Sequence, residues 1–418
     1  MLRRTILAVL FFILASSVAF ANGLILEGIS TRSVGRGGTN LGWADNGGVI
    51  HDNAGGLINM RNRSFLEVSA ELLFSDVDYR DPGGVSDYRQ DVVPLGNFAV
   101  GKKVNEDVAV GLGVFTSGGF AGRSVIPGPV PFTGDRTYKS FGALIRVLPA
   151  VSLRLTDRWS VGATTGVAAS HIEFEGPNTI QTGFLAGTPV LLDVQGTGAA
   201  FTWSIGSQYK VSSKTTLGVS YQSENRFDLD GKTTTIIPGI GESVFDSTMS
   251  LVWPESVGLG VRHAINQRQV ASLDLIYYNW QRSFDALGLE MRNASNPIVA
   301  TFGTINDTLP LKWRDSLSVR TGFEQTLANQ DKLRFGYVYH RNPIPASTQT
   351  VYVATPLEHT FSVGYGTRFR GWNLDLAYVY TTGDTVDIGT SEIIGGDFND
   401  GFLKTDAHFL YLSFGRGT

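Results

Sequence analysis

Side chains that could perform catalysis are few and scattered along this 418-residue chain. Its six histidines share no recurring spacing: His51, His171, His263, His340, His359 and His408. The chain has no G-x-S-x-G motif, which would mark a serine nucleophile, and no H-E-x-x-H motif, which would bind zinc. It also has no cysteine, so thiolate chemistry and disulfides are excluded. We therefore expect no enzyme, no metal and no cofactor; a catalytic triad assembled across distant strands stays open as an alternative.

The glycine-rich stretch SVGRGG at residues 33–38 is the one candidate for a phosphate-binding loop. Such loops follow G-x-G-x-x-G or G-x-x-x-x-G-K-[ST], and neither pattern occurs here. Basic residues form no tract interleaved with aromatic side chains, so nucleic acid is not an expected partner. The glycines therefore favour tight turns over nucleotide binding.

The first 21 residues have the organisation of a secretory signal peptide. Arg3 and Arg4 precede an apolar run from Thr5 to Phe20, and AFA at residues 19–21 matches the A-x-A cleavage pattern. The apolar run is short for a membrane-spanning helix. We expect residues 1–21 to be removed on export and the mature chain to begin at Asn22. Loss of the two arginines would change the formal net charge from −4 to −6.

The composition and periodicity favour a membrane barrel over a soluble domain. Charged residues make up only 17% of the chain, whereas about a quarter is usual for globular proteins. From Ser64 onward apolar residues alternate with small or polar ones, as in WNLDLAYVY at residues 372–380. Several alternating segments are much longer than the strands of about 5–6 residues in soluble proteins. Strands that cross an outer membrane need about 9–11 residues.

Counting these segments predicts an all-β fold, a 14-stranded antiparallel transmembrane β-barrel over residues 64–418. The expected strands begin near Ser64, Pro94, Asp107, Thr137, Trp159, Gly198, Thr215, Thr248, Gln267, Leu311, Lys332, Leu357, Trp372 and Leu403. Short turns alternate with long links, which we expect to be extracellular loops at 118–132, 176–196, 232–247, 285–310 and 381–401. Tryptophans near strand ends are expected in the interface girdles: Trp159, Trp203, Trp253, Trp280, Trp313 and Trp372.

Residues 22–63 do not alternate and are rich in glycine. A barrel of fourteen strands has a lumen too wide for side chains alone to fill. We therefore expect this segment to fold back into the lumen as an N-terminal hatch that plugs the barrel. Its turns are expected at Gly35, Arg36, Gly37, Asp45, Asn46 and Asn53, since glycine and Asx residues favour tight turns.

The ordered set of motifs resembles the FadL-type (OmpP1/FadL/TodX) family of outer-membrane transporters. In the hatch, Gly35-Arg36-Gly37, Ala44-Asp45-Asn46 and Asn53-Ala54 match the family pattern, although the proline of its Asn-Pro-Ala is missing. Downstream matches in family order are YQSE at 221–224, WPES at 253–256, YYNW at 277–280, WRD at 313–315, RFG at 334–336 and HTFS at 359–362. The resemblance spans essentially the whole mature chain.

The resemblance implies passive transport of long-chain fatty acids across a Gram-negative outer membrane. The ligand would bind in an apolar pocket, the hatch would shift, and the ligand would leave through a lateral gap made by a kink in the third strand. Gly111 and Gly113 are our candidates for the kink; packing of these glycines against the hatch is an equal alternative. The expected pocket residues are apolar side chains of two loops: Phe120, Ile126, Phe132, Phe184 and Leu185.

A fatty-acid carboxylate would need an inward-facing basic partner. By strand alternation the candidates are Arg262, Arg320, Arg334 and Arg368, with structural pairing to acids such as Glu324 or Asp375 as the alternative. The resemblance also implies a monomer surrounded by outer-membrane lipid and lipopolysaccharide. The barrel-assembly machinery would read the strand that ends at Phe414. Rival functions are an aromatic-hydrocarbon channel of the same family, a general porin, a barrel enzyme and a purely structural or adhesive barrel.

Overall fold

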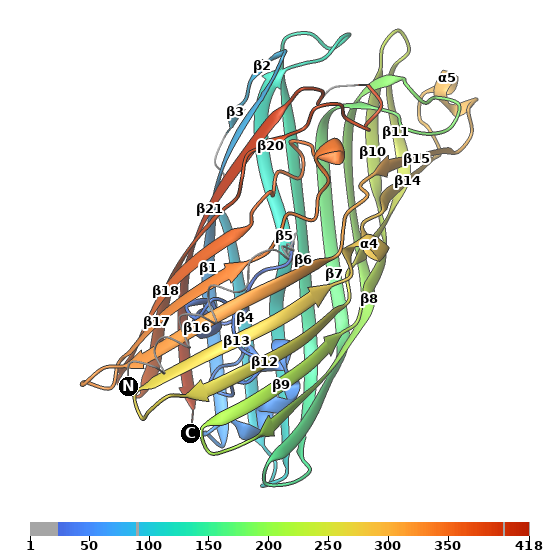
Figure 1. Cartoon of the computed structure of the whole chain (residues 1–418). Helices are drawn as coiled ribbons and strands as arrows, with labels where there is room; N and C mark the ends of the chain where they lie inside the picture. Colours follow the sequence, from blue (N-terminus) through green and yellow to red (C-terminus); the bar gives the residue numbers. More distant parts are fainter. Residues whose placement is uncertain (1–23, 89–91, 396–397, 418) are drawn as a thin grey trace.

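Fourteen antiparallel strands close into a barrel in the described part of the computed structural model, residues 24–88, 92–395 and 398–417. Closure is made by β1 (Ser64–Asp81) and β21 (Phe402–Gly417), which pair from Phe65 opposite Gly417 to Arg80 opposite Phe402 (Figure 1). The predicted fold class, an all-β 14-stranded barrel, is confirmed. No helix among the described residues is long and apolar enough to cross a membrane. The predicted signal peptide lies outside the described residues.

Within the described residues ten wall strands are continuous and four consist of two segments. Besides β1 and β21, the continuous strands are β4 (Val93–Lys103), β5 (Val108–Pro127), β6 (Asp135–Arg154), β7 (Trp159–Thr179), β8 (Pro189–Lys210), β17 (Lys332–Tyr339), β18 (His359–Phe369) and β19 (Trp372–Thr382). The divided strands are β9 (Thr215–Gln222) with β10 (Asn225–Ile237), β11 (Gly241–Trp253) with β12 (Ser256–Ala264), β13 (Gln269–Tyr278) with β14 (Ala286–Arg292), and β15 (Ile305–Pro310) with β16 (Ser316–Thr326).

Short elements lie inside the lumen and in the loops. They are α2 (Thr31–Val34), α3 (Val49–Asp52), the 3-10 helix η1 (Ala54–Asn59), β2 (Gly84–Val85), β3 (Asp87–Tyr88), α4 (Trp280–Ser283), α5 (Pro297–Ala300), the 3-10 helix η2 (Ala346–Thr348) and β20 (Val386–Asp387). The upper end of the barrel in Figure 1 carries the long links, and the lower end carries the short turns.

The divided strands separate two tiers of the wall. In the lower tier β9 pairs with β12 and β12 with β13, while in the upper tier β10 pairs with β11 and β11 with β14. The bend between β11 and β12 contains Pro254, which has no N–H to donate into a ladder. The bend between β9 and β10 contains Ser223 and Glu224. The wall is therefore interrupted at one level over neighbouring strands.

Several expected loops are strand in the structure. β8 begins at Pro189 instead of Gly198, β11 begins at Gly241 instead of Thr248, and β5 continues to Pro127. These upper segments stand above the apolar part of the wall and carry polar residues outward, such as Asp228 and Asp230 on β10. Apolar alternation therefore could not mark their true ends.

The tryptophans divide between the outer face and the interior. Trp159, Trp203 and Trp372 are exposed on the outer face, as the girdle prediction requires. Trp253, Trp280 and Trp313 are at most 2% exposed and belong to an internal apolar cluster, so their placement in the girdles was wrong. These three lie near the bends between the two tiers, where the strand direction changes and simple alternation fails.

Candidate functional site

The hatch, residues 24–63, lies within the barrel and contacts strands all round the wall. It bonds to Glu67 on β1, Ser152 on β6, Asp274 on β13 and Asp375 on β19. Asn53 fixes one turn, because its side chain accepts from Gly55 N at 3.1 Å and donates to the Leu41 and Ser207 carbonyls at 2.9 Å. A single polar side chain thus joins the hatch turn to the wall.

An ionic network holds the hatch against three wall strands. Its members are Arg32, Arg36 and Asp45 of the hatch with Glu324 on β16, Arg334 on β17 and Asp375 on β19. Arg32 reaches Asp375 at 2.8 Å, and Arg334 bridges Glu324 at 2.8 Å and Asp375 at 2.7 Å. Lys332 also lies 3.6 Å from Glu324, so each carboxylate of the network faces at least one cation. Removing one partner would leave an uncompensated buried charge.

Arg36 and Asp45 form the part of this network that lies within the hatch. Arg36 is fully buried and donates to both Asp45 oxygens, at 2.7 and 3.1 Å. Burial alone would raise the pKa of Asp45, but the charges of Arg36 and Arg32 outweigh it and hold that pKa below its usual value. Asn46 donates to Asp45 at 2.8 Å and so orients the carboxylate.

Gly35 and Gly37 let the hatch backbone touch the wall. A methyl group on Gly35 would lie 3.0 Å from the Gly364 Cα on β18. Gly37 has a φ of +63° and its nitrogen donates to the Ser362 hydroxyl at 3.0 Å. All six expected hatch residues therefore make contacts that shape or anchor the segment.

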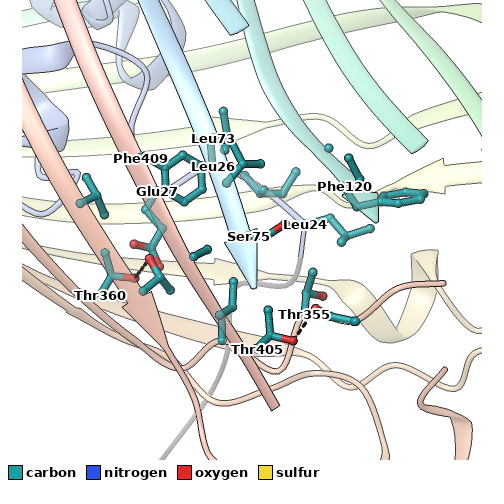
Figure 2. A pocket seen from close by; sticks show the side chains of 18 of the residues that line it. Leu24, Leu26, Glu27, Leu73, Ser75, Phe120, Thr355, Thr360, Thr405 and Phe409 are labelled. Carbon is teal, nitrogen blue, oxygen red and sulfur yellow. Dashed lines mark hydrogen bonds between the residues drawn. The ribbon is translucent and has the colours of Figure 1, made fainter. Parts of the chain in front are cut away.

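Two apolar chambers lie beside and above the hatch, with volumes of about 120 and 100 Å³. The first, which we call the hatch chamber, lies between residues 24–28, β1, β5, β21 and residues 351–357; Figure 2 shows the side chains around it. Its few polar groups include the Glu27 carboxylate and the hydroxyls of Thr355, Thr360 and Thr405.

The second chamber, the loop chamber, is lined by β7, β8, β11 and β14 and by residues from the upper links. Its wall includes Leu251, Phe284 and Trp313, which belong to the large internal apolar cluster. The Phe284 and Trp313 rings lie 4.7 Å apart between centroids. Among the described residues no lysine, arginine or histidine lines either chamber.

Leu24, Phe120 and Tyr352 line both chambers and therefore form the partition between them. Figure 2 places Leu24 and Phe120 close together at one side of the hatch chamber. Leu24 belongs to the hatch, whereas Phe120 belongs to β5. A shift of the first hatch residues would therefore remove one of the three side chains that separate the chambers.

The hatch chamber adjoins an interruption of the barrel wall. The β4–β5 ladder ends at Asn97 opposite Phe115, and on this side β5 is next paired at Ser124, with β3. Among the described strands none pairs with residues 116–123 of β5 on this side. Hatch backbone approaches instead: Leu26 N donates to Ser117 O at 3.1 Å and Gly119 N donates to Leu24 O at 3.0 Å.

The irregularity of the third strand is centred on Ser117. The register of the β5–β6 ladder shifts between Thr116 and Gly118, which makes Ser117 a bulge. Gly111 and Gly113, the expected kink, lie in the regular ladder opposite Gly101 and Ala99, so the kink was expected too early in the strand. A methyl group on Gly111 would lie 2.8 Å from Ile50 of the hatch, which fits the alternative that this glycine allows close packing against the hatch.

Arg146 on β6 is a buried cation beside this bulge. It is 4% exposed and donates to Asn225 Oδ1 at 2.9 and 3.2 Å and to Gln222 Oε1 at 2.9 Å. His51 Nε2 lies 3.4 Å from Arg146 Nη1 and 3.1 Å from the Ser117 hydroxyl. Among the described residues no carboxylate forms an ion pair with Arg146. A buried charge without a counter-ion is costly unless something compensates it.

None of the four expected basic residues lines a chamber. Arg334 belongs to the ionic network, where it pairs with Glu324 and Asp375, as in the alternative to carboxylate binding. Arg320 donates to the Glu27 carbonyl at 2.8 Å, Arg262 lies over the Trp43 ring at 4.7 Å, and Arg368 is exposed and bonds Asn373. Strand alternation was used to place these four arginines on the lumen side. It gave no such signal for Arg146, because the residues around it on β6 are apolar on both faces of the strand.

Of the five expected apolar pocket residues, only Phe120 lines the chambers. Ile126 is buried in a separate cluster with Tyr79 and Tyr138, and Phe132 is buried in a loop. Phe184 is 67% exposed, and the neighbouring Leu185 packs against another loop cluster. Sequence reasoning missed Glu27, which contacts His340 and Arg320 and closes one side of the hatch chamber.

The sequence pattern of one family matches residues 12–413: the outer membrane transport proteins described as OMPP1/FadL/TodX. The chain belongs to this family. Like other members of the OMPP1/FadL/TodX family, it is therefore an outer-membrane barrel that transports hydrophobic molecules. The family and the similar structures below are transport proteins and not enzymes.

Solved structures of similar fold include three family members. A Pseudomonas aeruginosa FadL homologue is 16% identical with a TM-score of 0.76, and 95% of this chain covers 100% of that one. The Pseudomonas putida toluene transporter TodX is 17% identical with a TM-score of 0.77 and the same coverage. The Ralstonia pickettii toluene transporter TbuX is 17% identical with a TM-score of 0.72, covering 94% and 99%. No curated protein matches the chain.

Proposed function

We propose that the protein takes up long-chain fatty acids, with the carboxylate held at Arg146 and the chain in the two chambers. The observation that carries this proposal is the burial of Arg146 without a carboxylate partner. Arg146 lies one inward position from Leu144, a member of the apolar cluster that includes Trp253 and Leu251. A carboxylate at this place would gain charge-assisted hydrogen bonds and neutralise the cation.

In this proposal the exit is lateral, through the interrupted wall beside β5. Residues 116–123 of β5 are covered there by hatch backbone and not by a wall strand. A chain that leaves sideways passes from an apolar chamber into lipid and avoids exposure to water, which costs about 25 cal/mol per Å² of apolar surface. The moving part would be residues 24–28, because the ionic network fixes the rest of the hatch.

The test is binding of oleate and of methyl oleate to the purified full-length protein and to Arg146→Gln. We expect the variant to bind oleate about tenfold or more weakly, since hydrogen bonds to charged groups contribute about 1.5–3 kcal/mol. Methyl oleate should bind both proteins alike. Arg262→Gln is the matched control, because Arg262 is an inward arginine stacked on Trp43 outside the chambers. Unchanged oleate binding by Arg146→Gln would contradict the proposal.

An aromatic hydrocarbon is a second candidate ligand, favoured by the chambers themselves. No cation among the described residues lines them, and their volumes are close to that of an apolar cavity of about 150 Å³ known to hold benzene. Measuring toluene binding in the same assay distinguishes the fatty-acid proposal from the hydrocarbon proposal. Toluene binding unaffected by Arg146→Gln, together with no oleate binding by either protein, would favour the hydrocarbon.

We further infer that residues 1–21 are cleaved on export and that the barrel is a monomer inserted by the barrel-assembly machinery. The N-terminal A-x-A pattern supports the first inference, and the closure of the wall within one chain supports the second. Mass spectrometry of the protein purified from outer membranes tests the first, with Asn22 as the expected first residue.

A further inference from the structure

A second interruption of the wall lies between β8 and the β9–β10 bend. β8 pairs with β9 through residues 204–210 and with β10 through residues 191–197. Between these ladders, residues 198–203 have no paired strand on that side among the described residues. Polar contacts bridge the interval instead: Trp203 N donates to the Ser223 hydroxyl at 3.1 Å, and Asn225 Nδ2 donates to the Phe201 carbonyl at 3.2 Å.

A groove of about 500 Å³ opens on the outer face at this interruption. We call it the outer groove and define it by its lining residues: Ala200, Phe201, Trp203, Tyr221, Ser223, Glu224, Arg226, Glu255 and Arg282. Its floor is aromatic, with Phe201 67% exposed and Trp203 41% exposed. Large exposed aromatic side chains beside charged ones are typical of a site for an amphipathic molecule.

The outer groove lies at the upper margin of the apolar wall. Below it the outward side chains are apolar, as at Val219 on β9 and Leu259 on β12. Above it β10 presents Asp228 and Asp230 outward. Tyrosine hydroxyls mark the boundary, since Tyr221 donates to Glu255 at 2.7 Å. This is the level at which lipid head groups meet acyl chains.

The charges of the groove are unevenly satisfied. Arg226 donates to Glu224 Oε1 at 2.8 Å, and Glu255 accepts from Tyr221 and Asn279. Arg282 lies 3.6 Å from Glu224 and 3.9 Å from Glu255, and it donates no hydrogen bond to a described residue. Glu224 Oε2, beneath Arg282, has no hydrogen-bond partner. The groove thus holds one guanidinium without an acceptor and one carboxylate oxygen without a donor.

We propose that the outer groove binds the head group of an outer-leaflet lipid that carries a phosphate beside N–H or O–H donors. Arg282 turns outward to the phosphate, which uncovers Glu224 Oε2 for a donor group of the same head group. The acyl chain lies over Phe201 and Trp203. Lipopolysaccharide, the lipid of the outer leaflet, is the expected occupant, and phosphatidylethanolamine presents the same phosphate and donor chemistry in a simpler probe. The site lies outside the chambers and does not depend on the ligand that the protein transports.

The experiment measures lipid retained by purified full-length protein, using native mass spectrometry after exchange into detergent with one lipid at a time. Phosphatidylethanolamine and phosphatidylcholine share the phosphate, but only the first has N–H donors. We expect phosphatidylethanolamine to bind about tenfold more tightly, the size of one hydrogen bond to a charged group. Glu224→Gln should remove this preference, and Arg282→Gln should weaken both lipids about tenfold. Arg292→Gln, another outward arginine paired with Glu290, is the control.

Lipopolysaccharide in a parallel arm identifies the natural source. Tighter retention of lipopolysaccharide than of phosphatidylethanolamine, with the same loss in Arg282→Gln, assigns the groove to the glycolipid; the reverse order assigns it to the phospholipid. Equal binding of phosphatidylethanolamine and phosphatidylcholine to the unmodified protein would overturn the proposal. So would retention that Arg282→Gln leaves unchanged.

Discussion

Gly37 of the hatch and Gly336 of β17 touch backbone to backbone, so closely that a methyl group on Gly336 would overlap the Gly37 nitrogen. Gly37 directly follows Arg36 of the Arg36–Asp45 pair, and Gly336 lies on β17, the strand that also carries Arg334. The hatch can sit at its observed depth only because neither position has a side chain.

Gly336→Ala should therefore loosen the hatch without opening the barrel ladder. Inserting a methyl group into a packed site costs about 1–3 kcal/mol. Hydrogen exchange at residues 35–38 measures the loss of protection. Gly288→Ala on β14 is the control, because a methyl group there would meet only the Ser250 Cβ, at an ordinary contact distance of 4.0 Å. Equal protection in both variants would show that the contact does not hold the hatch.

Arg334→Met should release the hatch more strongly. Glu324 and Asp375 would both lose their bond to Arg334 while buried, and breaking a buried pair costs about 3–5 kcal/mol. Protease cleavage within residues 30–59 of the folded protein reports the release. Arg292→Met, an exposed arginine paired with Glu290, should leave cleavage unchanged. Resistance of Arg334→Met to cleavage would contradict a role for the ionic network.

Docking of the hatch should weaken as pH falls below about 6.5, the ordinary pKa of histidine. Burial lowers the pKa of His51, which Asp52, Ser117 and Arg146 face. A group whose docked pKa is lowered contributes stability above its undocked pKa, and this stability is lost as pH falls. The pKa of Asp45 is lowered as well, so protonation of Asp45 also weakens docking of the hatch, but only near pH 4 and below.

Hydrogen exchange of residues 49–59 between pH 8 and 5 measures this dependence. His51→Gln should flatten the profile between pH 6.5 and 5, because the amide does not titrate. A profile identical to that of the unmodified protein would show that another group titrates there.

Phe120→Ala should thin the partition between the hatch and loop chambers and speed uptake of hydrophobic ligands. Phe120 lines both chambers, and its removal leaves Leu24 and Tyr352 as the remaining partition. The cost in stability should be about 3–5 kcal/mol, the usual range for a buried phenylalanine. Initial uptake rates test the effect. Phe184→Ala is the control, because Phe184 is exposed outside the chambers. Slower uptake in Phe120→Ala would mean that the ring binds ligand and does not divide the passage.

Strand periodicity could predict the wall because lipid and lumen impose opposite demands on alternate residues. The starts expected at Ser64, Trp159, Lys332 and Trp372 coincide with β1, β7, β17 and β19. Apolar alternation no longer marks the strands where the contrast between lipid and lumen ends. β10 and β11 continue above the apolar band with polar residues outward, so their extent could not be read from apolar spacing.

The site was less predictable because it depends on contacts between distant strands. Trp253, Trp280 and Trp313 meet inside only because the divided strands bend, and the bends have no simple periodic signal. Arg334 has acids within reach, whereas Arg146 has none among the described residues, and only the folded chain distinguishes them. The bulge at Ser117 lies beside Gly118 and Gly119, where a methyl group would come within 2.8 Å of Leu24 O and 2.5 Å of Gly142 O, so the glycine pair marks the place but the hatch contact is known only from the fold.

The ionic network has a consequence for the passage of ions. Its arginines and acids already pair with one another between the hatch and the wall, so an inorganic ion that reaches the network meets no unpaired charge there. In the proposed lateral exit, only the first few hatch residues move for an oily solute to pass sideways. Under that proposal the paired charges stay in place while the solute passes, so we expect the protein to carry hydrophobic molecules without conducting salts.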